Sequence, residues 1–166
     1  MPIEPGDPAP AFTLRDQEGR AHALADYAGR WVVLFFYPKD DTSGCTTEAC
    51  GFQEALPDFS GLDAAVLGVS ILAPKSKAKF AAKNGLSYPL LADDRENAEG
   101  KPDPGLARAF GVWKEKSMYG RTFMGVERTT FLIDPEGRVA RRWDKPKPAS
   151  HPAEVLEALR ELRGGS

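Results

Sequence analysis

The chain has 166 residues, of which 42% are hydrophobic and 28% charged, and its formal net charge is −2. A chain of this size fits one domain, spanning residues 1–166, whose core is large enough to fold without a disulfide or a metal. The charges are interleaved without a basic block, and no apolar run approaches the ~20 residues of a membrane helix, so neither nucleic acid nor a membrane is an expected partner.

The first predicted elements are a short β-hairpin, a helical turn and a buried strand. Residues 12–14 and 20–24 flank a polar turn, as in two strands joined by a tight connection. Residues 25–29 predict one helical turn closed by glycine. Residues 31–37 (WVVLFFY) form a continuous apolar run, which is typical of a central strand covered on both faces, and Pro38 ends it.

A polar loop and a series of alternating helices and strands follow. A helix is predicted from about Cys45 to Leu56, where Pro57 stops it or begins the next turn. The next predicted elements are strands over residues 64–70 and 88–92 and helices over residues 76–84 and 106–110.

The last part of the chain predicts a second hairpin, over residues 129–134 and 138–143, and an amphipathic helix over residues 153–162. Residues 93–105, rich in charge, Pro and Gly, predict a long mobile loop. The alternation of strands and helices favours the α/β class. We expect a mixed central β-sheet with a parallel core and an antiparallel edge, flanked by helices and preceded by the N-terminal β-hairpin.

Cys45 follows the buried strand across a short loop and opens a helix. The N-terminus of a helix carries partial positive charge and unpaired N–H groups, which stabilise a thiolate, the nucleophilic form of cysteine. Thr42, Ser43 and Thr46 lie alongside and offer hydroxyls that can cap the helix or bond an incoming oxygen. From position alone, the alternative is a small buried cysteine without chemistry.

Cys50 lies five residues further along the same predicted helix. Helix geometry places Cα atoms at this spacing about 8 to 9 Å apart, whereas a disulfide needs them within roughly 7 Å. The two cysteines therefore cannot bond while the helix is intact, which suits a redox cycle better than a permanent cross-link. A metal site is not expected, because the C-x4-C spacing is not a usual zinc motif and His22 and His151 are remote.

Several separated segments match one known family. Pro38, Thr42 and Cys45 stand at the spacing P-x-x-x-T-x-x-C. The matching segments are residues 37–50 (YPKDDTSGCTTEAC), residues 110–113 (FGVW) and residues 125–134 (GVERTTFLID). With them the chain resembles the peroxiredoxins over nearly its whole length, and most closely the bacterioferritin-comigratory-protein or peroxiredoxin Q branch.

The resemblance implies a thioredoxin-like fold and a thiol-dependent peroxidase. Cys45 matches the peroxidatic cysteine, Cys50 the resolving cysteine of an intramolecular disulfide, and Arg128 the active-site arginine. Thr42 is expected to bond the peroxide and Pro38 to shield the site from water. The implied substrates are hydrogen peroxide and organic hydroperoxides, and the implied reductant is thioredoxin or a similar dithiol. No metal or organic cofactor is implied.

The resemblance leaves the surroundings of the site open. Glu48, one helical turn after Cys45, either orients Arg128 or is simply solvated. A pocket lined by Phe36, Tyr37, Phe52 or Trp113 would admit alkyl hydroperoxides. Residues 94–104 look like an insertion relative to the family, and we expect a neutral surface loop rather than a role in specificity or assembly.

Two other functions use similar residues. A thiol–disulfide oxidoreductase acting on proteins would want a C-x-x-C motif, which this chain lacks. A redox sensor would use a switch between Cys45 and Cys50 to alter binding, and it shares the oxidation step with a peroxidase. We expect a monomer, with a dimer as the alternative. A cytoplasmic location is expected because residues 1–10 do not resemble a secretory signal.

Overall fold

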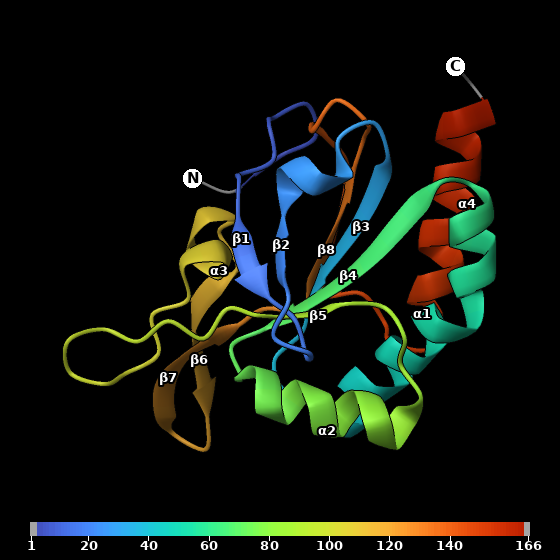
Figure 1. Cartoon of the computed structure of the whole chain (residues 1–166). Coiled ribbons are helices and arrows are strands. Elements are labelled where there is room, and N and C mark those ends of the chain that lie inside the picture. Colours follow the sequence, from blue (N-terminus) through green and yellow to red (C-terminus); the bar gives the residue numbers. More distant parts are fainter. Residues whose placement is uncertain (1–2, 165–166) are drawn as a thin grey trace.

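A seven-stranded sheet with helices on both faces dominates the computed structural model, which describes residues 3–164 (Figure 1). The strands are β1 (Thr13–Arg15), β2 (Ala21–Ala23), β3 (Trp31–Phe36), β4 (Ala64–Ser70), β5 (Leu90–Ala92), β6 (Trp113–Met118), β7 (Arg121–Val126), β8 (Thr129–Ile133) and β9 (Val139–Asp144). The helices are η1 (Leu24–Tyr27), α1 (Ser43–Gly61), α2 (Pro74–Asn84), α3 (Gly105–Ala109) and α4 (His151–Gly164).

The strand order across the sheet is β2-β1-β5-β4-β3-β8-β9, while β6 and β7 form a separate two-stranded ribbon. Strands β3, β4 and β5 are parallel. Strand β8 runs antiparallel to β3, β9 to β8 and β1 to β5. The predicted mixed sheet with a parallel core is therefore confirmed, but antiparallel strands lie on both sides of that core instead of at one edge.

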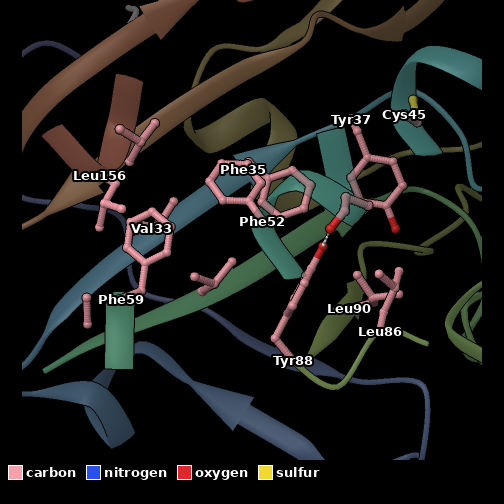
Figure 2. Close-up of a cluster of buried hydrophobic side chains, with 14 of the residues drawn as sticks. Val33, Phe35, Tyr37, Cys45, Phe52, Phe59, Leu86, Tyr88, Leu90 and Leu156 are labelled. Carbon is pink, nitrogen blue, oxygen red and sulfur yellow. Dashed lines mark hydrogen bonds between the residues drawn. The ribbon is translucent and has the colours of Figure 1, made fainter. Parts of the chain in front are cut away.

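Strand β3 is buried on both faces, which explains its apolar run without alternation. Val33 and Phe35 point into a core shared with α1, α2 and α4, part of which Figure 2 shows. Val32, Leu34 and Phe36 point into a second core on the opposite face, shared with α3. Because both faces are covered, the end of β3 lies deep in the molecule. The loop that follows β3 therefore starts from a buried, fixed strand.

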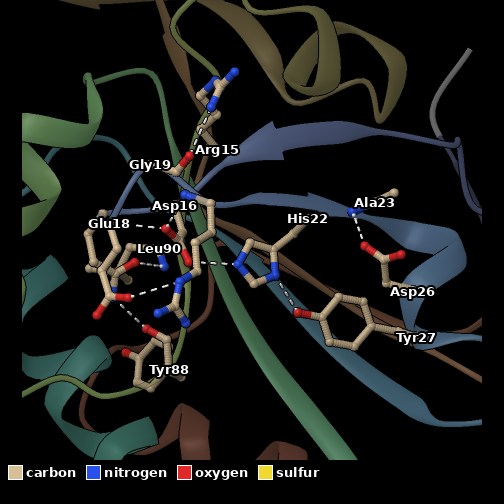
Figure 3. A network of polar contacts seen from close by, with 12 residues as sticks. Arg15, Asp16, Glu18, Gly19, His22, Ala23, Asp26, Tyr27, Tyr88 and Leu90 are labelled. Atoms are coloured by element: carbon tan, nitrogen blue, oxygen red, sulfur yellow. Dashed lines mark hydrogen bonds and ion pairs between the residues drawn. The ribbon is translucent and has the colours of Figure 1, made fainter.

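Polar contacts fix the N-terminal hairpin to the sheet (Figure 3). Asp16 Oδ2 lies 2.7 Å from His22 Nε2, and His22 Nδ1 lies 2.7 Å from the hydroxyl of Tyr27. The side-chain amide of Gln17 makes two hydrogen bonds with the backbone of residues 88–90, which precede and begin β5. The hairpin therefore contacts the parallel core in two ways, through the pairing of β1 with β5 and through the side chain of Gln17.

Helix α1 continues to Gly61, so the prediction that it ends near Pro57 is wrong. A proline inside a helix removes one backbone hydrogen bond, but packing can offset that loss. Here the turn after Pro57 carries Phe59, which is fully buried with its ring 6.0 Å from that of Phe52. No helix in residues 3–164 is long and apolar enough to cross a membrane.

The ribbon of β6 and β7 was not predicted, because most of its side chains are at least partly exposed and its sequence lacks a buried face. Tyr119 and Gly120 both have positive φ at the turn, as in a type I′ hairpin. The preferred first residue of such a turn is Asn, Asp or Gly, and tyrosine gives no such signal. Residues 94–102 are exposed, Asp103 is half-buried and Pro104 is buried, and Arg95 pairs with Asp103 at 3.1 Å.

Gly68 in β4 marks a place where no side chain fits. A Cβ there would lie 2.9 Å from Phe35 Cζ and 3.0 Å from Leu90 Cδ2. We expect Gly68→Ala to lower the free energy of unfolding by ~1–3 kcal/mol, measured by urea denaturation, because these buried neighbours must move. Gly61→Ala is the control: a Cβ at this position would meet nothing within 4 Å, so alanine should be neutral or slightly stabilising there. Equal effects of the two substitutions would contradict the close packing around Gly68.

Candidate active site

Cys45 lies in the first turn of α1, just after the segment that leaves β3, here called the active-site loop (residues 38–42). Its side chain is only 1% exposed. Thr42 occupies the N-cap position, and its carbonyl accepts a 2.8 Å hydrogen bond from the backbone N–H of Thr46. The Thr42 hydroxyl donates to the carbonyl of Lys39 at 3.1 Å, so it closes the loop and does not cap the helix.

Arg128 reaches Cys45 from the short connection between β7 and β8. Its Nη2 donates to Cys45 Sγ at 3.1 Å, and its Nη1 donates to Glu48 Oε1 at 2.8 Å. Burial alone would lower the pKa of Arg128, but the charges of Glu48 and Cys45 outweigh it and raise that pKa. A permanently charged guanidinium therefore stands against the sulfur.

Glu48 is fully buried, so the alternative in which it is simply solvated is wrong. Burial raises the pKa of Glu48 to about 7, although the charge and hydrogen bond of Arg128 oppose the shift. Its second oxygen, Oε2, has no hydrogen-bond partner within residues 3–164. Burial removes the Glu48 carboxylate from water, and its hydrogen-bonded partner is the guanidinium of Arg128. We infer that this contact fixes the orientation of Arg128.

A cleft of about 520 Å³ opens beside Arg128. The ribbon of β6 and β7 supplies most of its wall, and Pro38 contributes to the wall from the active-site loop. The lining residues are Pro38, Lys114, Glu115, Lys116, Ser117, Met118, Phe123, Glu127, Arg128 and Lys145. Cys45 is not among them, but it bonds the guanidinium that is part of this wall.

The prediction that Phe36, Tyr37 and Phe52 line this cleft is wrong, because all three are fully buried in the cores on the two faces of the sheet. Trp113 is half-buried and packs against the core next to α3 instead of lining the cleft. Besides Pro38, the apolar residues of the lining are two residues of the unpredicted ribbon, Met118 (56% exposed) and Phe123 (45% exposed).

Cys50 is half-buried on α1, and both cysteines are free thiols. They belong to one continuous helix, in which residues five apart are too distant for a disulfide. The helix is pinned close to Cys50 by two contacts. The Tyr88 hydroxyl donates to the Ala49 carbonyl at 2.7 Å, and Gly51 touches α4 so closely that a Cβ would lie 2.8 Å from Pro152 Cγ.

The two histidines have other partners. His22 belongs to the N-terminal hairpin, and His151 lies between Thr130 Oγ1 at 2.7 Å and Glu154 Oε1 at 3.0 Å. Burial lowers the pKa of His151. Across the part of the chain that the structure describes, no three His, Cys, Asp or Glu side chains come together as metal ligands would.

Glu48→Gln keeps the shape of the side chain and removes its charge. Because burial raises the pKa of Glu48 from 4.5 to about 7, the folded chain retains between these pH values a proton that the unfolded chain has lost. The free energy of unfolding of the wild type therefore falls through this group as the pH rises over that interval. The glutamine side chain of the variant does not titrate, so the variant does not lose this stability. As the pH rises over that interval, we expect the free energy of unfolding of Glu48→Gln to increase by ~1–3 kcal/mol relative to that of the wild type, measured by urea denaturation at a series of pH values.

The control for this measurement is Glu54→Gln, the same substitution at an exposed position of the same helix. A pH profile of Glu48→Gln parallel to that of the wild type would contradict the buried ionisation.

Comparisons with known proteins support one family. A model described as the AhpC/TSA family matches residues 5–142. The chain is 44% identical over 162 residues to a peroxiredoxin Bcp of Bacillus subtilis, covering 98% of both chains. It is 46% identical over 142 residues to a peroxiredoxin Bcp of Xanthomonas campestris, covering 86% of this chain and 84% of that one.

Solved structures agree with these relatives. The bacterioferritin comigratory protein of Xanthomonas campestris, studied as a trapped intermediate and ligand complex for its alkyl peroxide reduction, matches with a TM-score of 0.82 at 44% identity over 91% of each chain. A cysteine mutant of PrxQ from Xylella fastidiosa matches with a TM-score of 0.89 at 38% identity, covering 98% of this chain and 99% of that one. The expected thioredoxin-like fold is confirmed.

Proposed function

The chain belongs to the AhpC/TSA family, in its Bcp or peroxiredoxin Q branch, and we propose that Cys45 is the residue with which this thiol-dependent peroxidase attacks its substrate. The observation that carries the assignment is the shared guanidinium, which bonds Cys45 Sγ at 3.1 Å while Glu48 holds its other nitrogen at 2.8 Å. A cysteine kept only for packing would need no buried ion pair directed at its sulfur.

The first step is a nucleophilic substitution at oxygen. The Cys45 thiolate forms a bond to one peroxide oxygen, the O–O bond breaks, and the other oxygen leaves and takes up a proton as water or an alcohol. Negative charge spreads along the S–O–O line, so fixed donors beside it stabilise the transition state. Arg128 supplies such donors from the wall of the cleft.

Thr42 and Pro38 complete the proposed site. The Thr42 hydroxyl lies on the active-site loop next to α1, and its oxygen can accept a hydrogen bond from the O–H group of the peroxide. Pro38 lies in the wall of the cleft and limits the access of water. Met118 and Phe123 give the cleft an apolar side, which supports organic hydroperoxides as substrates beside hydrogen peroxide.

The second step forms the disulfide. The Cys45 sulfenic acid condenses with the Cys50 thiol, an S–S bond forms and water leaves. This step needs the first turns of α1 to unwind, because the two residues lie too far apart in the intact helix. Thioredoxin or a similar dithiol then returns two electrons. A monomer in a reducing compartment such as the cytoplasm suits a cycle that ends with both thiols restored.

The test of this function is peroxide consumption by wild type, Cys45→Ser and Cys50→Ser with a thioredoxin system as electron donor. We expect turnover by wild type and none by Cys45→Ser. Cys50→Ser should keep the first oxidation, seen as one sulfenic acid per chain, and lose turnover coupled to thioredoxin. Wild-type activity in Cys45→Ser would overturn the proposal and bring the redox sensor forward.

Arg128→Lys keeps the positive charge but removes the two guanidinium nitrogens that contact Glu48 and Cys45. A single ammonium cannot hold Glu48 and face Cys45 with the geometry of two guanidinium nitrogens. We expect kcat/KM for peroxide to fall at least about tenfold, measured by the rate of Cys45 oxidation in stopped flow. Arg121→Lys, an exposed position on β7, is the matched control and should keep the wild-type rate. An unchanged rate in Arg128→Lys would contradict a role for the guanidinium geometry and show that a positive charge beside Cys45 is enough for the reaction.

A further inference from the structure

A buried lysine lies beneath the active-site loop and has no part in the steps above. Lys77, on α2, is 0% exposed. Its Nζ donates to Ser70 Oγ at the end of β4 and lies 3.5 Å from both the Tyr37 hydroxyl and Asp40 Oδ2. An ammonium group is rarely placed where water cannot reach it, and it is then paired. Its closest acidic partner, Asp40, belongs to the active-site loop.

Asp40 is held from two sides. Its side chain is 2% exposed, although it stands on a loop where a carboxylate would ordinarily be solvated. The Tyr37 hydroxyl donates to Oδ1 at 2.5 Å, and Ser76 Oγ donates to Oδ2 at 2.8 Å. Tyr37, directly after β3, and Ser76 in the first turn of α2 thus hold the middle of the loop through one buried side chain.

The next residue shows why such an anchor is needed. Asp41 has a φ of 63°, in the left-handed region that a non-glycine residue seldom adopts. Its side chain pairs with Lys83 at 3.0 Å, but both groups are more than half exposed, and pairs of this kind contribute little. A strained backbone persists where its surroundings fix it, and at Asp41 the fixed neighbour is the buried Asp40.

We propose that Lys77 and Asp40 are positioning residues that hold the active-site loop and the first turn of α1 in the peroxide-reactive conformation. The pair acts through the loop and not on the sulfur. By holding the loop, it sets how readily the first turn of α1 unwinds for Cys45 to reach Cys50. This inference rests on the proposed function of the two cysteines.

A competition between two reactions reports on this unwinding. The Cys45 sulfenic acid either condenses with the Cys50 thiol, with release of water, or attacks a second peroxide. In the second case a further S–O bond forms, the O–O bond breaks, and sulfinic acid and an alcohol or water result. Condensation needs the unwound helix, whereas the second oxidation needs the reactive conformation. The fraction of turnovers that end as sulfinic acid therefore rises with the time that the first turn stays folded.

Because Lys77 acts through its charge, we expect the holding of the active-site loop to depend on pH. Burial lowers the pKa of Lys77 to about 8, although Asp40, Asp94 and Asp93 oppose the shift. The groups that face Lys77 are Tyr37 from the end of β3, Asp40 from the loop, Ser70 from β4, and Asp93 and Asp94 from the segment after β5. Burial keeps the pKa of Tyr37 well above its usual value, so the tyrosine stays neutral as Lys77 loses its proton.

The experiment measures the sulfinic fraction per turnover by mass spectrometry, together with the rate constant of the first oxidation. We expect Lys77→Met to lower both, the sulfinic fraction by at least about fivefold, since the loss of a buried charged partner shifts a local equilibrium by such a factor. The control is Lys75→Met, the same change at an exposed position of α2, which should behave as wild type.

Two further variants separate positioning from general stability. Asp40→Asn is nearly isosteric and should lower the sulfinic fraction, as Lys77→Met does. It provides the test if Lys77→Met does not fold. Combining it with Lys77→Met leaves no unpaired buried charge and should restore part of the wild-type fraction. Raising the pH from about 7 to about 9 should lower the sulfinic fraction more in wild type than in Lys77→Met, which lacks the titrating group.

An unchanged sulfinic fraction in folded Lys77→Met and Asp40→Asn would overturn the inference, even if both variants lose stability. Identical pH profiles of wild type and Lys77→Met would overturn the pH dependence and leave the positioning role to the variants. If wild type itself consumes no peroxide, the proposed function has failed and not the positioning role.

Discussion

One guanidinium, shared between a sulfur and a buried carboxylate, is the contact around which the site is arranged. The antiparallel pairing of β3 with β8 makes it possible, because Phe36 stands opposite Thr129 in the register and Arg128 therefore emerges beside the loop that follows β3. Strand β3 lies between parallel β4 and antiparallel β8, and helices cover both of its faces. Helix α1 then returns across the core with Cys45 and Glu48 on successive turns. Sheet topology thus brings together residues more than eighty positions apart in sequence.

Two buried ion pairs lie in this region: Lys77 with Asp40 of the active-site loop, and Arg128 with Glu48 near the start of α1. Buried pairs contribute little net stability, because the cost of removing each charge from water offsets their attraction. Breaking one by removing a single partner is costly, however, since the other charge stays behind. Such pairs are therefore suited to fixing geometry, which is the role proposed here for both of them.

Much of the fold follows from local patterns: the unbroken apolar run of β3, the alternation of strands and helices, and a cysteine at the start of a helix. Arg128 could be identified only through its family motif, since an isolated arginine carries no such signal. Three features lay beyond sequence reasoning for physical reasons. The ribbon of β6 and β7 has no buried face, the turn after Pro57 depends on the packing of Phe59, and Lys77 has the residue type of a solvated helix face. Full burial of β3 also explains why Phe36 and Tyr37 are absent from the cleft.

The tight contact of Gly51 with Pro152 fixes α1 against α4 directly after Cys50. Beyond it lie Phe52 and Phe59, packed in the aromatic core of Figure 2, and Tyr88 ties the helix at Ala49 just before it. Local opening confined to the start of the helix leaves those rings out of water. Transiently exposed apolar surface is what drives aggregation of partly opened chains. In the proposed cycle, the segment that opens is short and mostly polar, so repeated opening exposes little apolar surface and does not favour aggregation.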